Sequence, residues 1–250
     1  MGNYIITKIN QSAFPPVPGA VNHLLYSYLP PLDGNGDEIV ILHSYGNMET
    51  CKDRGLQLRV NIIMKRMKNV SFVLYDYPTR GEGTNETAVN EMIVRVYESF
   101  HIKYKDKKKI YLFGRSIGCV PTCHLVDYLI QRNRIHEIQG VILQSPMCSA
   151  FSMFFPFCHD YLCFTPLPCL DQLNNLKIIQ QNQTKWPRTM IISGALDVLV
   201  SPAHCRHLFK FMPKHSVYLM LTTRDHNNID YNENAEDSPL RELTLFIEYK

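Results

Sequence analysis

The chain has 250 residues, of which 45% are hydrophobic and 20% charged, and its formal net charge is +3. This composition is ordinary for one folded domain with a sizeable core, and it excludes disordered, collagen-like and repeat proteins. The small net charge gives no argument for binding nucleic acid. The dense basic run at residues 103–109 predicts a solvated loop, with a contact to acidic phospholipid as the alternative.

The cysteines form no C-x-x-C pair and no zinc-finger spacing with histidine, so we expect neither a metal site nor any other cofactor. Without a signal sequence or an apolar run long enough to cross a membrane, they are expected to be reduced thiols of a cytoplasmic protein. Met1-Gly2 is the start that N-myristoylation needs, but the motif requires Ser or Thr at the position of Ile6.

Residues 1–35 are expected to be an irregular lead-in rich in proline, with an edge strand within residues 23–28 as the exception. Residues 36–250 then alternate short apolar strands with longer helical patterns. The strands are predicted at 38–43, 70–75, 109–113, 140–145, 188–193 and 217–221. This alternation is typical of βαβ units and predicts a single α/β domain, with a mostly parallel central sheet and helices on both faces.

A G-x-S-x-G motif, Gly114-Arg-Ser-Ile-Gly118, joins the strand at 109–113 to a helical pattern. In this context a sharp turn lifts the serine above the sheet edge, and the glycines avoid a collision with the following helix. Ser116 is therefore the predicted nucleophile. Arg115 is interpreted either as a spacer or as a charge that attracts an acidic group of a substrate.

A serine hydroxyl needs a neighbouring base and a third group that orients this base. In α/β-hydrolases the acid and then the histidine follow the nucleophile, each after a later strand. Asp197 follows the strand at 188–193 and His226 follows the strand at 217–221, so both are predicted to lie beside Ser116.

Other residues of the same types are rivals for these roles. Asp225 and Asp230 flank His226 and are interpreted as loop-capping or solvated residues. His43 and His124 are interpreted as satisfied core or surface histidines. His204 and His207 share a helix face, and we expect them to be solvated rather than to bind a metal, because no third ligand is near.

The oxyanion of a tetrahedral intermediate is predicted to bind the backbone amides of Asn47 and Ile117. Residues 147–186 fit neither a helix nor a strand template, and we expect a lid or a pocket wall there, with a core-facing helix as the alternative. The residues predicted to line an acyl pocket are Met147, Phe151, Phe154 and Phe155.

Several of these stretches together resemble the alpha/beta-hydrolase domain-containing protein 17 family over residues 36–250. They are residues 75–77, 116–122, 141–146, 194–197 and 225–230. The resemblance implies the α/β-hydrolase fold and a membrane-associated serine hydrolase that removes palmitate from protein cysteines, with Ser116 as nucleophile, Asp197 as acid and His226 as base. Two positions differ, since Tyr45 stands where the family has His and Asp225 stands where it usually has Gly.

We therefore expect a serine hydrolase that cleaves acyl thioesters, in the cytoplasm or at the cytoplasmic face of membranes. Its expected substrate is an acylated protein or a lipid-like ester. A lipid or small-molecule carboxylesterase is the nearest alternative. A hydrolase-fold protein that binds partners without catalysis is a further alternative, against which the complete set of Ser, Asp and His argues.

Overall fold

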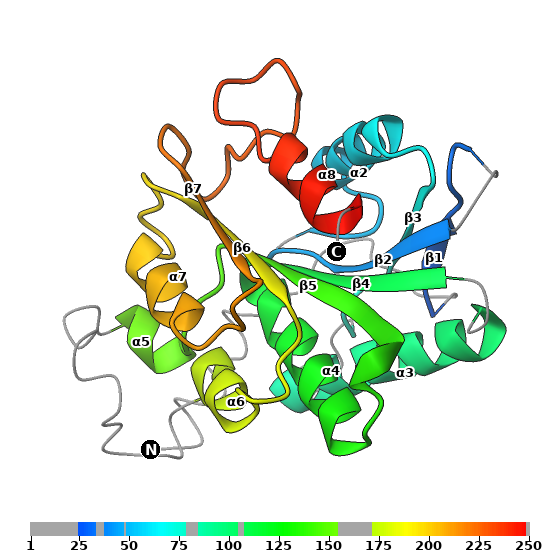
Figure 1. The fold of residues 1–250 in the computed structure, drawn as a ribbon, viewed down its shortest axis with the longest axis horizontal. Helices are drawn as coiled ribbons and strands as arrows, with labels where there is room; N and C mark the ends of the chain where they lie inside the picture. The colour runs from blue at the N-terminus through cyan, green and yellow to red at the C-terminus, as the bar shows by residue number, and fades with distance from the viewer. Residues whose placement is uncertain are drawn as a thin grey trace.

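The computed structural model describes residues 25–33, 38–47, 49–78, 85–104, 108–154 and 172–248. Within these residues a seven-stranded sheet has the order β1-β3-β2-β4-β5-β6-β7 (Figure 1). β1 runs antiparallel to β3, and every other neighbouring pair is parallel. The strands are β1 (Ser27–Leu29), β2 (Glu38–Ser44), β3 (Val70–Leu74), β4 (Lys108–Arg115), β5 (Ile138–Gln144), β6 (Thr189–Gly194) and β7 (Val217–Leu221).

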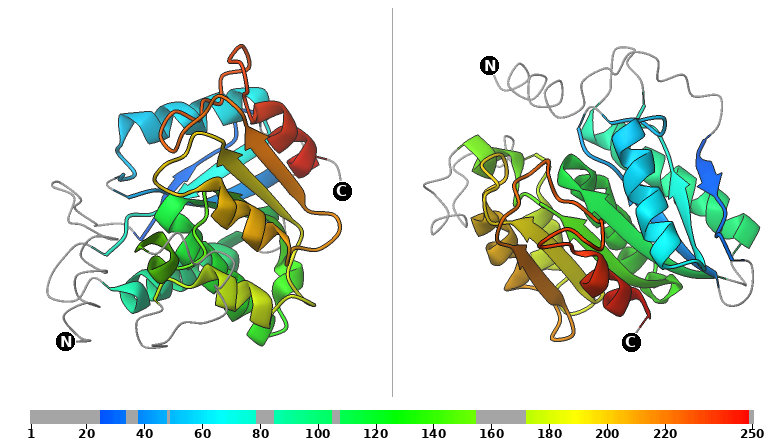
Figure 2. Two further views of the ribbon diagram at one scale, coloured as in Figure 1. Left: turned by 90° about the vertical axis from the view of Figure 1, so that its left-hand side faces the viewer. Right: turned by 90° about the horizontal axis from the view of Figure 1, so that it is seen from above.

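Helices cover both faces of this sheet, as Figures 1 and 2 show. One face carries α2 (Arg54–Arg66) and α8 (Leu240–Glu248). The opposite face carries α3 (Glu86–Tyr104), α4 (Cys119–Gln131), α6 (Asn175–Gln181) and α7 (Pro202–Phe209). The short helix α5 (Ala150–Phe154) and the 3-10 turns η1 (Ser116–Gly118) and η2 (Ile135–Glu137) lie in the connections. This arrangement confirms the predicted α/β class.

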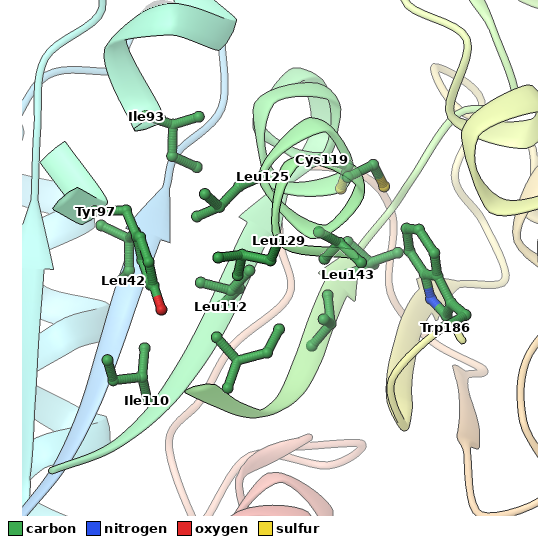
Figure 3. Packing of buried hydrophobic residues seen from close by; sticks show 14 of the residues in the cluster. Leu42, Ile93, Tyr97, Ile110, Leu112, Cys119, Leu125, Leu129, Leu143 and Trp186 are labelled. Carbon is green, nitrogen blue, oxygen red and sulfur yellow. The ribbon is translucent and has the colours of Figure 1, made fainter. Parts of the chain in front are cut away.

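The alternation of side chains explains why the strands read as continuous apolar runs. Successive residues of a strand point to opposite faces of the sheet. In β2, Ile39 and Ile41 pack on the side of α2 and α8, while Val40 and Leu42 pack on the side of α3 and α4. Because helices cover both faces, both sets of side chains are buried. Figure 3 shows some of the buried side chains on the side of α3 and α4, with Leu42 among them.

α2 shows how local sequence sets the bounds of a helix. The carboxylate of Asp53 accepts a hydrogen bond from the amide of Leu56 at 2.9 Å and so caps the first turn. Leu56, Val60 and Ile63 are buried, and their spacing of four and three residues places them on one face. The helix returns the chain from the carboxyl edge of the sheet to the start of β3.

The edge strand expected within residues 23–28 is present as β1, where Tyr28 pairs with Val73. β1 is the exception that was expected within the lead-in at 1–35, and it belongs to the sheet. Gly2 lies outside the described residues, as do residues 105–107 of the basic run and 155–171 of the expected lid or pocket segment. No helix in the described part of the chain is long and apolar enough to cross a membrane.

The ends of the parallel strands lie along one edge of the sheet. Ser44 of β2 pairs with Gly114 of β4, and Gly194 of β6 pairs with Leu221 of β7. Loops that follow parallel strands therefore leave from this same carboxyl edge, where α/β proteins of this kind bind ligands. The predicted nucleophile, acid and base all follow such strands.

Candidate active site

Ser116 lies at the turn between β4 and α4, where its side chain is half-buried. Its φ is 53°, in the left-handed region that residues other than glycine rarely adopt. The turn leaves no room for side chains on the flanking glycines. A Cβ on Gly114 would lie 2.7 Å from Cα of Cys119, and one on Gly118 would lie 2.1 Å from the carbonyl oxygen of Ser44. Packing around the turn thus holds the serine in a strained conformation.

His226 and Asp197 form a hydrogen-bonded chain with Ser116. Nε2 of His226 lies 2.9 Å from Oγ of Ser116, and Nδ1 of His226 lies 2.8 Å from Oδ2 of Asp197. The structure therefore brings the predicted nucleophile, base and acid together. When Nδ1–H donates to Asp197, Nε2 accepts the serine proton, which is the geometry that a serine nucleophile requires.

Asp197 is well placed to orient the imidazole because its carboxylate is buried and fully bound. The side chain is 0% exposed. Its Oδ1 accepts hydrogen bonds from the backbone amides of Leu199 and Val200, at 3.0 and 2.8 Å. These bonds leave Oδ2 for His226. Two backbone donors and one imidazole thus fix the orientation of the carboxylate.

The loops that carry the acid and the base are joined to each other by their backbones. The amide of Leu196 donates to the carbonyl of Arg224 at 2.9 Å. A Cβ on Gly194 would lie 2.4 Å from that same carbonyl oxygen, so only glycine allows the loops to approach this closely. The position of Asp197 relative to His226 is therefore set by main-chain contacts as well as by the side-chain bond.

The aspartates that flank His226 serve its loop and not its ring. Oδ1 of Asp225 accepts the amides of Asn227 and Asn228 at 2.8 and 3.0 Å. Oδ1 of Asp230 accepts the amide of Asn232 at 2.9 Å. These contacts confirm the loop-capping interpretation. They also give a use to the aspartate that stands where the resembled family usually has glycine.

The loop after β2 lies against the nucleophile turn. A Cβ on Gly118 would meet the carbonyl oxygens of Ser44 and Tyr45 at 2.1 and 2.6 Å, so the two segments are in direct contact. Asn47 is exposed on this loop, and Ile117 is buried directly after Ser116. An amide from each of these two segments forms the oxyanion hole of α/β-hydrolases. The amides of Asn47 and Ile117 remain the predicted donors.

Tyr45 fixes this loop from the position where the resembled family has histidine. Its hydroxyl donates to Oδ1 of Asp76, which also accepts the amide of Cys51 at 2.7 Å. Its carbonyl accepts the hydroxyl of Tyr77 at 2.6 Å, and the rings of the two tyrosines lie 5.0 Å apart. Burial, together with the neighbouring Cys51 and Asp76, raises the pKa of Tyr45 far above its ordinary value, so the phenol stays protonated as a donor.

Arg115 and Glu49 form an ion pair that the sequence did not reveal. Nη1 of Arg115 lies 3.2 Å from Oε2 of Glu49, and the two side chains are 9% and 12% exposed. Glu49 also pairs with Arg59 of α2. Burial alone would raise the pKa of Glu49, but the charges of Arg115 and Arg59 hold it below its ordinary value. The guanidinium of Arg115 is thus engaged inside the protein, and the interpretation as a mere spacer was wrong.

A small apolar cluster lies next to the nucleophile turn. It joins Ile117 to Met147, one of the predicted acyl-pocket residues. Its other buried members are Val89, Val120, Ala150, Leu173 and Val200, of which the sequence reasoning named none for the pocket. Phe151 is half-buried in α5, whereas the side chain of Phe154 and the whole of Phe155 lie outside the described residues. The cluster therefore contains Met147, one of the predicted pocket residues, next to Ile117 of the nucleophile turn.

The expectation for His204 was wrong. This residue is 2% exposed, and its Nδ1 accepts the amide of Cys148 at 3.3 Å. His207 on the same helix is half-buried, with its ring 5.6 Å from that of Phe211. His43 is a buried core residue as expected, with Nδ1 3.1 Å from the carbonyl oxygen of Phe113, and burial lowers its pKa to about 4. In the described residues no cluster of His, Cys, Asp and Glu could hold a metal ion.

The sequence of this chain was compared with those of known proteins. No family model matches the chain. Alpha/beta hydrolase domain-containing protein 17C of Xenopus tropicalis is 24% identical over 199 residues, which cover 78% of this chain and 58% of that protein. The 17C protein of Homo sapiens is 23% identical over 194 residues, 76% of this chain and 53% of its own length. The chain is thus similar in sequence to members of the alpha/beta-hydrolase domain-containing protein 17 family. It spans little more than half the length of these 17C relatives.

Solved structures of proteins titled as hydrolases share the fold of this chain. A monoacylglycerol lipase from Paleococcus ferrophilus covers 88% of this chain and 98% of its own, with a TM-score of 0.58 and 13% identity. An alpha-beta serine hydrolase homologue from Coxiella burnetii covers 89% of each chain, with a TM-score of 0.58 and 11% identity. These matches confirm the predicted α/β-hydrolase fold.

Proposed function

We propose that this protein is a serine hydrolase that cleaves acyl thioesters on protein cysteines, palmitoyl-cysteine above all, in the cytoplasm or at the cytoplasmic face of membranes. The observation that carries the proposal is the continuous chain of hydrogen bonds from Ser116 through His226 to Asp197. The choice of a thioester as substrate rests on the sequence similarity to the alpha/beta-hydrolase domain-containing protein 17 family. The hydrogen-bonded chain supports the two half-reactions proposed below.

In the first half-reaction, Oγ of Ser116 attacks the carbonyl carbon of the acyl group while its proton passes to Nε2 of His226. Asp197 holds Nδ1–H and stabilises the imidazolium. The negative charge that develops on the carbonyl oxygen is taken up by the predicted amide donors, Ile117 and Asn47. The carbon–sulfur bond then breaks, the thiol leaves with the proton from His226, and the acyl group stays on Ser116.

In the second half-reaction, His226 removes a proton from water, and the resulting hydroxide attacks the acyl carbon. The bond to Oγ breaks, Ser116 recovers its proton from His226, and the free acid leaves. A thiolate is a better leaving group than an alkoxide, so the first half-reaction needs less assistance for a thioester than for an oxyester. The acyl chain is then the part of the substrate that the protein must select.

The apolar cluster beside Ile117 supports an acyl substrate. Met147, Leu173 and Val200 come from three separate connections, and all are buried next to the nucleophile turn. Apolar side chains around a few convergent polar groups are the usual composition of a small-molecule site. We propose that Met147, Phe151, Phe154 and Phe155 line the pocket that binds the acyl chain of the substrate.

A lipid or small-molecule carboxylesterase is the second candidate, because the same hydrogen-bonded chain attacks an oxyester. One protein of the same fold is a monoacylglycerol lipase, and that activity is known of that protein alone. A fluorophosphonate probe tests the nucleophile first. It is expected to label the wild type and not Ser116→Ala, and an unlabelled wild type would favour a protein that binds partners without catalysis.

A matched set of substrates then separates the two enzymatic candidates. A peptide carrying palmitoyl-cysteine, the same peptide carrying palmitoyl-serine, a monoacylglycerol and a short nitrophenyl ester are compared by kcat/KM. We expect the thioester peptide to be turned over at least about tenfold better than the oxyester peptide, which corresponds to about 1.4 kcal/mol in the barrier. Preference for the monoacylglycerol over both peptides would identify a carboxylesterase instead.

A further inference from the structure

We infer that Arg115 is a positioning residue that holds the loop of the base and the loop of the oxyanion donor in register with the nucleophile. The inference rests on the proposed function, since it concerns the same site. Arg115 is the residue directly before Ser116 and the last residue of β4. Its backbone is therefore fixed by the centre of the sheet, while its side chain reaches two loops that come from other strands.

The first contact is with the loop of the base. Nη2 of Arg115 donates to the carbonyl oxygen of His226 at 3.3 Å and to Oδ1 of Asn227 at 3.4 Å. The first of these bonds reaches the backbone of His226, whereas Asp197 binds its ring. The imidazole is thus held at two points. One fixes the direction of Nδ1–H, and the other fixes where the residue itself lies relative to β4.

The second contact is with the loop after β2. Oε2 of Glu49 accepts the amide of Gly46 at 2.7 Å and faces Nη1 of Arg115 at 3.2 Å. One carboxylate oxygen thereby connects Arg115 to the residue before Asn47, the predicted oxyanion donor. A Cβ on Gly46 would lie 2.2 Å from Nη1 of Arg115, so the guanidinium occupies the space that a side chain there would need.

Burial makes this connection strong enough to position a loop. Exposed ion pairs contribute little, because solvent competes for both charges. The side chains of Arg115 and Glu49 are 9% and 12% exposed. Removing Glu49 would leave the buried guanidinium of Arg115 with neutral acceptors alone, and removing Arg115 would leave Glu49 with Arg59 as its ion-pair partner. A planar guanidinium also donates in fixed directions from separate nitrogen atoms, whereas the three donors of an ammonium group rotate about a single nitrogen.

The test compares Arg115→Gln and Arg115→Lys with Arg134→Gln, a matched control. Arg134 also pairs with two carboxylates, those of Glu98 and Glu137, but it lies between α3 and η2, away from the site. Labelling by a fluorophosphonate and hydrolysis of a nitrophenyl ester are measured at a temperature well below the unfolding midpoint of each variant. Arg115→Gln is expected to lower kcat about 30-fold with little change in KM, because small misplacements of catalytic groups have effects of this size.

Arg115→Lys is expected to lower kcat less than Arg115→Gln does. It keeps the positive charge opposite Glu49 but lacks the second nitrogen, Nη2, that donates to the loop of His226. Arg134→Gln is expected to lose stability and keep its labelling rate. Wild-type labelling by Arg115→Gln, or an equal loss in Arg134→Gln, would overturn the inference. If Arg115→Gln does not fold, the inference is overturned by an Arg115→Lys variant that is labelled as fast as the wild type.

Hydrogen exchange supplies a readout that does not depend on activity. In Arg115→Lys, and in Arg115→Gln where it folds, amides in both loops, at residues 45–50 and 224–228, are expected to exchange faster than in wild type. Arg134→Gln is expected to leave both loops unchanged. Exchange that changes in one loop only, or in neither, contradicts the inference even if the wild type proves to be no hydrolase. An inert wild type with both loops loosened instead removes the proposed function and leaves the connection through Arg115 intact.

Discussion

Single side chains at this site act through the atoms that they present, and Asp197 is the clearest case. Its Oδ1 is engaged by two backbone amides and its Oδ2 by Nδ1 of His226. Both oxygens of the carboxylate are therefore in use. An isosteric change that replaces one oxygen by an NH2 group tests whether the direction of the bond to His226 matters.

Asp197→Asn is expected to lower kcat by about a factor of 10⁴ while the protein stays folded. The amide oxygen can still accept from Leu199 and Val200, so the NH2 group must face Nδ1 and favours the wrong tautomer of His226. Ester hydrolysis and fluorophosphonate labelling measure the loss. Asp225→Asn is the control, because its Oδ1 continues to cap the loop. Equal losses in the two variants would rule out this role for Asp197.

Gly118 offers a second test at the level of one atom. A Cβ there would lie 2.1 Å from the carbonyl oxygen of Ser44, so Gly118→Ala must push apart the nucleophile turn and the loop after β2. We expect the free energy of unfolding to fall by about 3 kcal/mol, as overpacked sites do, together with loss of labelling. Gly55→Ala, in the first turn of α2, is the control and is expected to change stability by less than about 1 kcal/mol. Urea unfolding measures both.

At the next level, connections between elements explain how the loops are held. Glu49 pairs with Arg115 at the end of β4 and with Arg59 of α2, and it accepts the amide of Gly46. One carboxylate thus joins a helix, a strand end and the loop between them. Because its pKa lies below the ordinary value of 4.5, the folded protein favours the charged form of Glu49.

This depressed pKa fixes the direction of a pH effect. The stabilisation from Glu49 is fully present above its unfolded pKa, near 4.5, and is lost as the pH falls through the lower folded value. Glu49→Gln is expected to be less stable than wild type by about 3 kcal/mol at pH 7. The difference should shrink as the pH falls below 4.5. Urea unfolding of both proteins at pH 7 and at acid pH measures it, and a difference that stays constant would speak against a charged Glu49.

The elements also show what the sequence could and could not predict. Each long strand was predicted, and so was each member of the hydrogen-bonded chain Ser116–His226–Asp197, because continuous apolar runs mark buried strands and these residues lie in the loops that follow them. The pair of Arg115 and Glu49 was missed, because a charge in a motif says nothing about a partner far away in the chain. His204 was misjudged for the same reason, since its partner is a backbone amide, that of Cys148, contributed by another segment.

Across the fold, one sheet separates two apolar clusters that lie on its opposite faces. Leu129 of α4 belongs to one and Leu243 of α8 to the other, and both are 0% exposed. Since the same strands supply both clusters, neither can persist without the other. The described residues should therefore unfold in a single transition, as expected for the one domain predicted from the sequence.

Leu129→Ala and Leu243→Ala are each expected to lower the free energy of unfolding by about 2–5 kcal/mol. Leu58→Ala, at a position 60% exposed, is the control and is expected to change it by less than about 0.5 kcal/mol. The fluorescence of Trp186, the one tryptophan of the chain, reports on one cluster, and circular dichroism reports on the whole. Transitions that separate in either core variant would show two independent units.

Ser116, Asp197 and His226 follow β4, β6 and β7, which span the sheet from its centre to an edge. No fragment of the chain that lacks β7 can place the imidazole beside the hydroxyl. The time at which a probe begins to label Ser116 covalently therefore reports when these strands have come together. In a refolding experiment, competence for capture should appear only when the outermost strand docks, later than the recovery of helical signal.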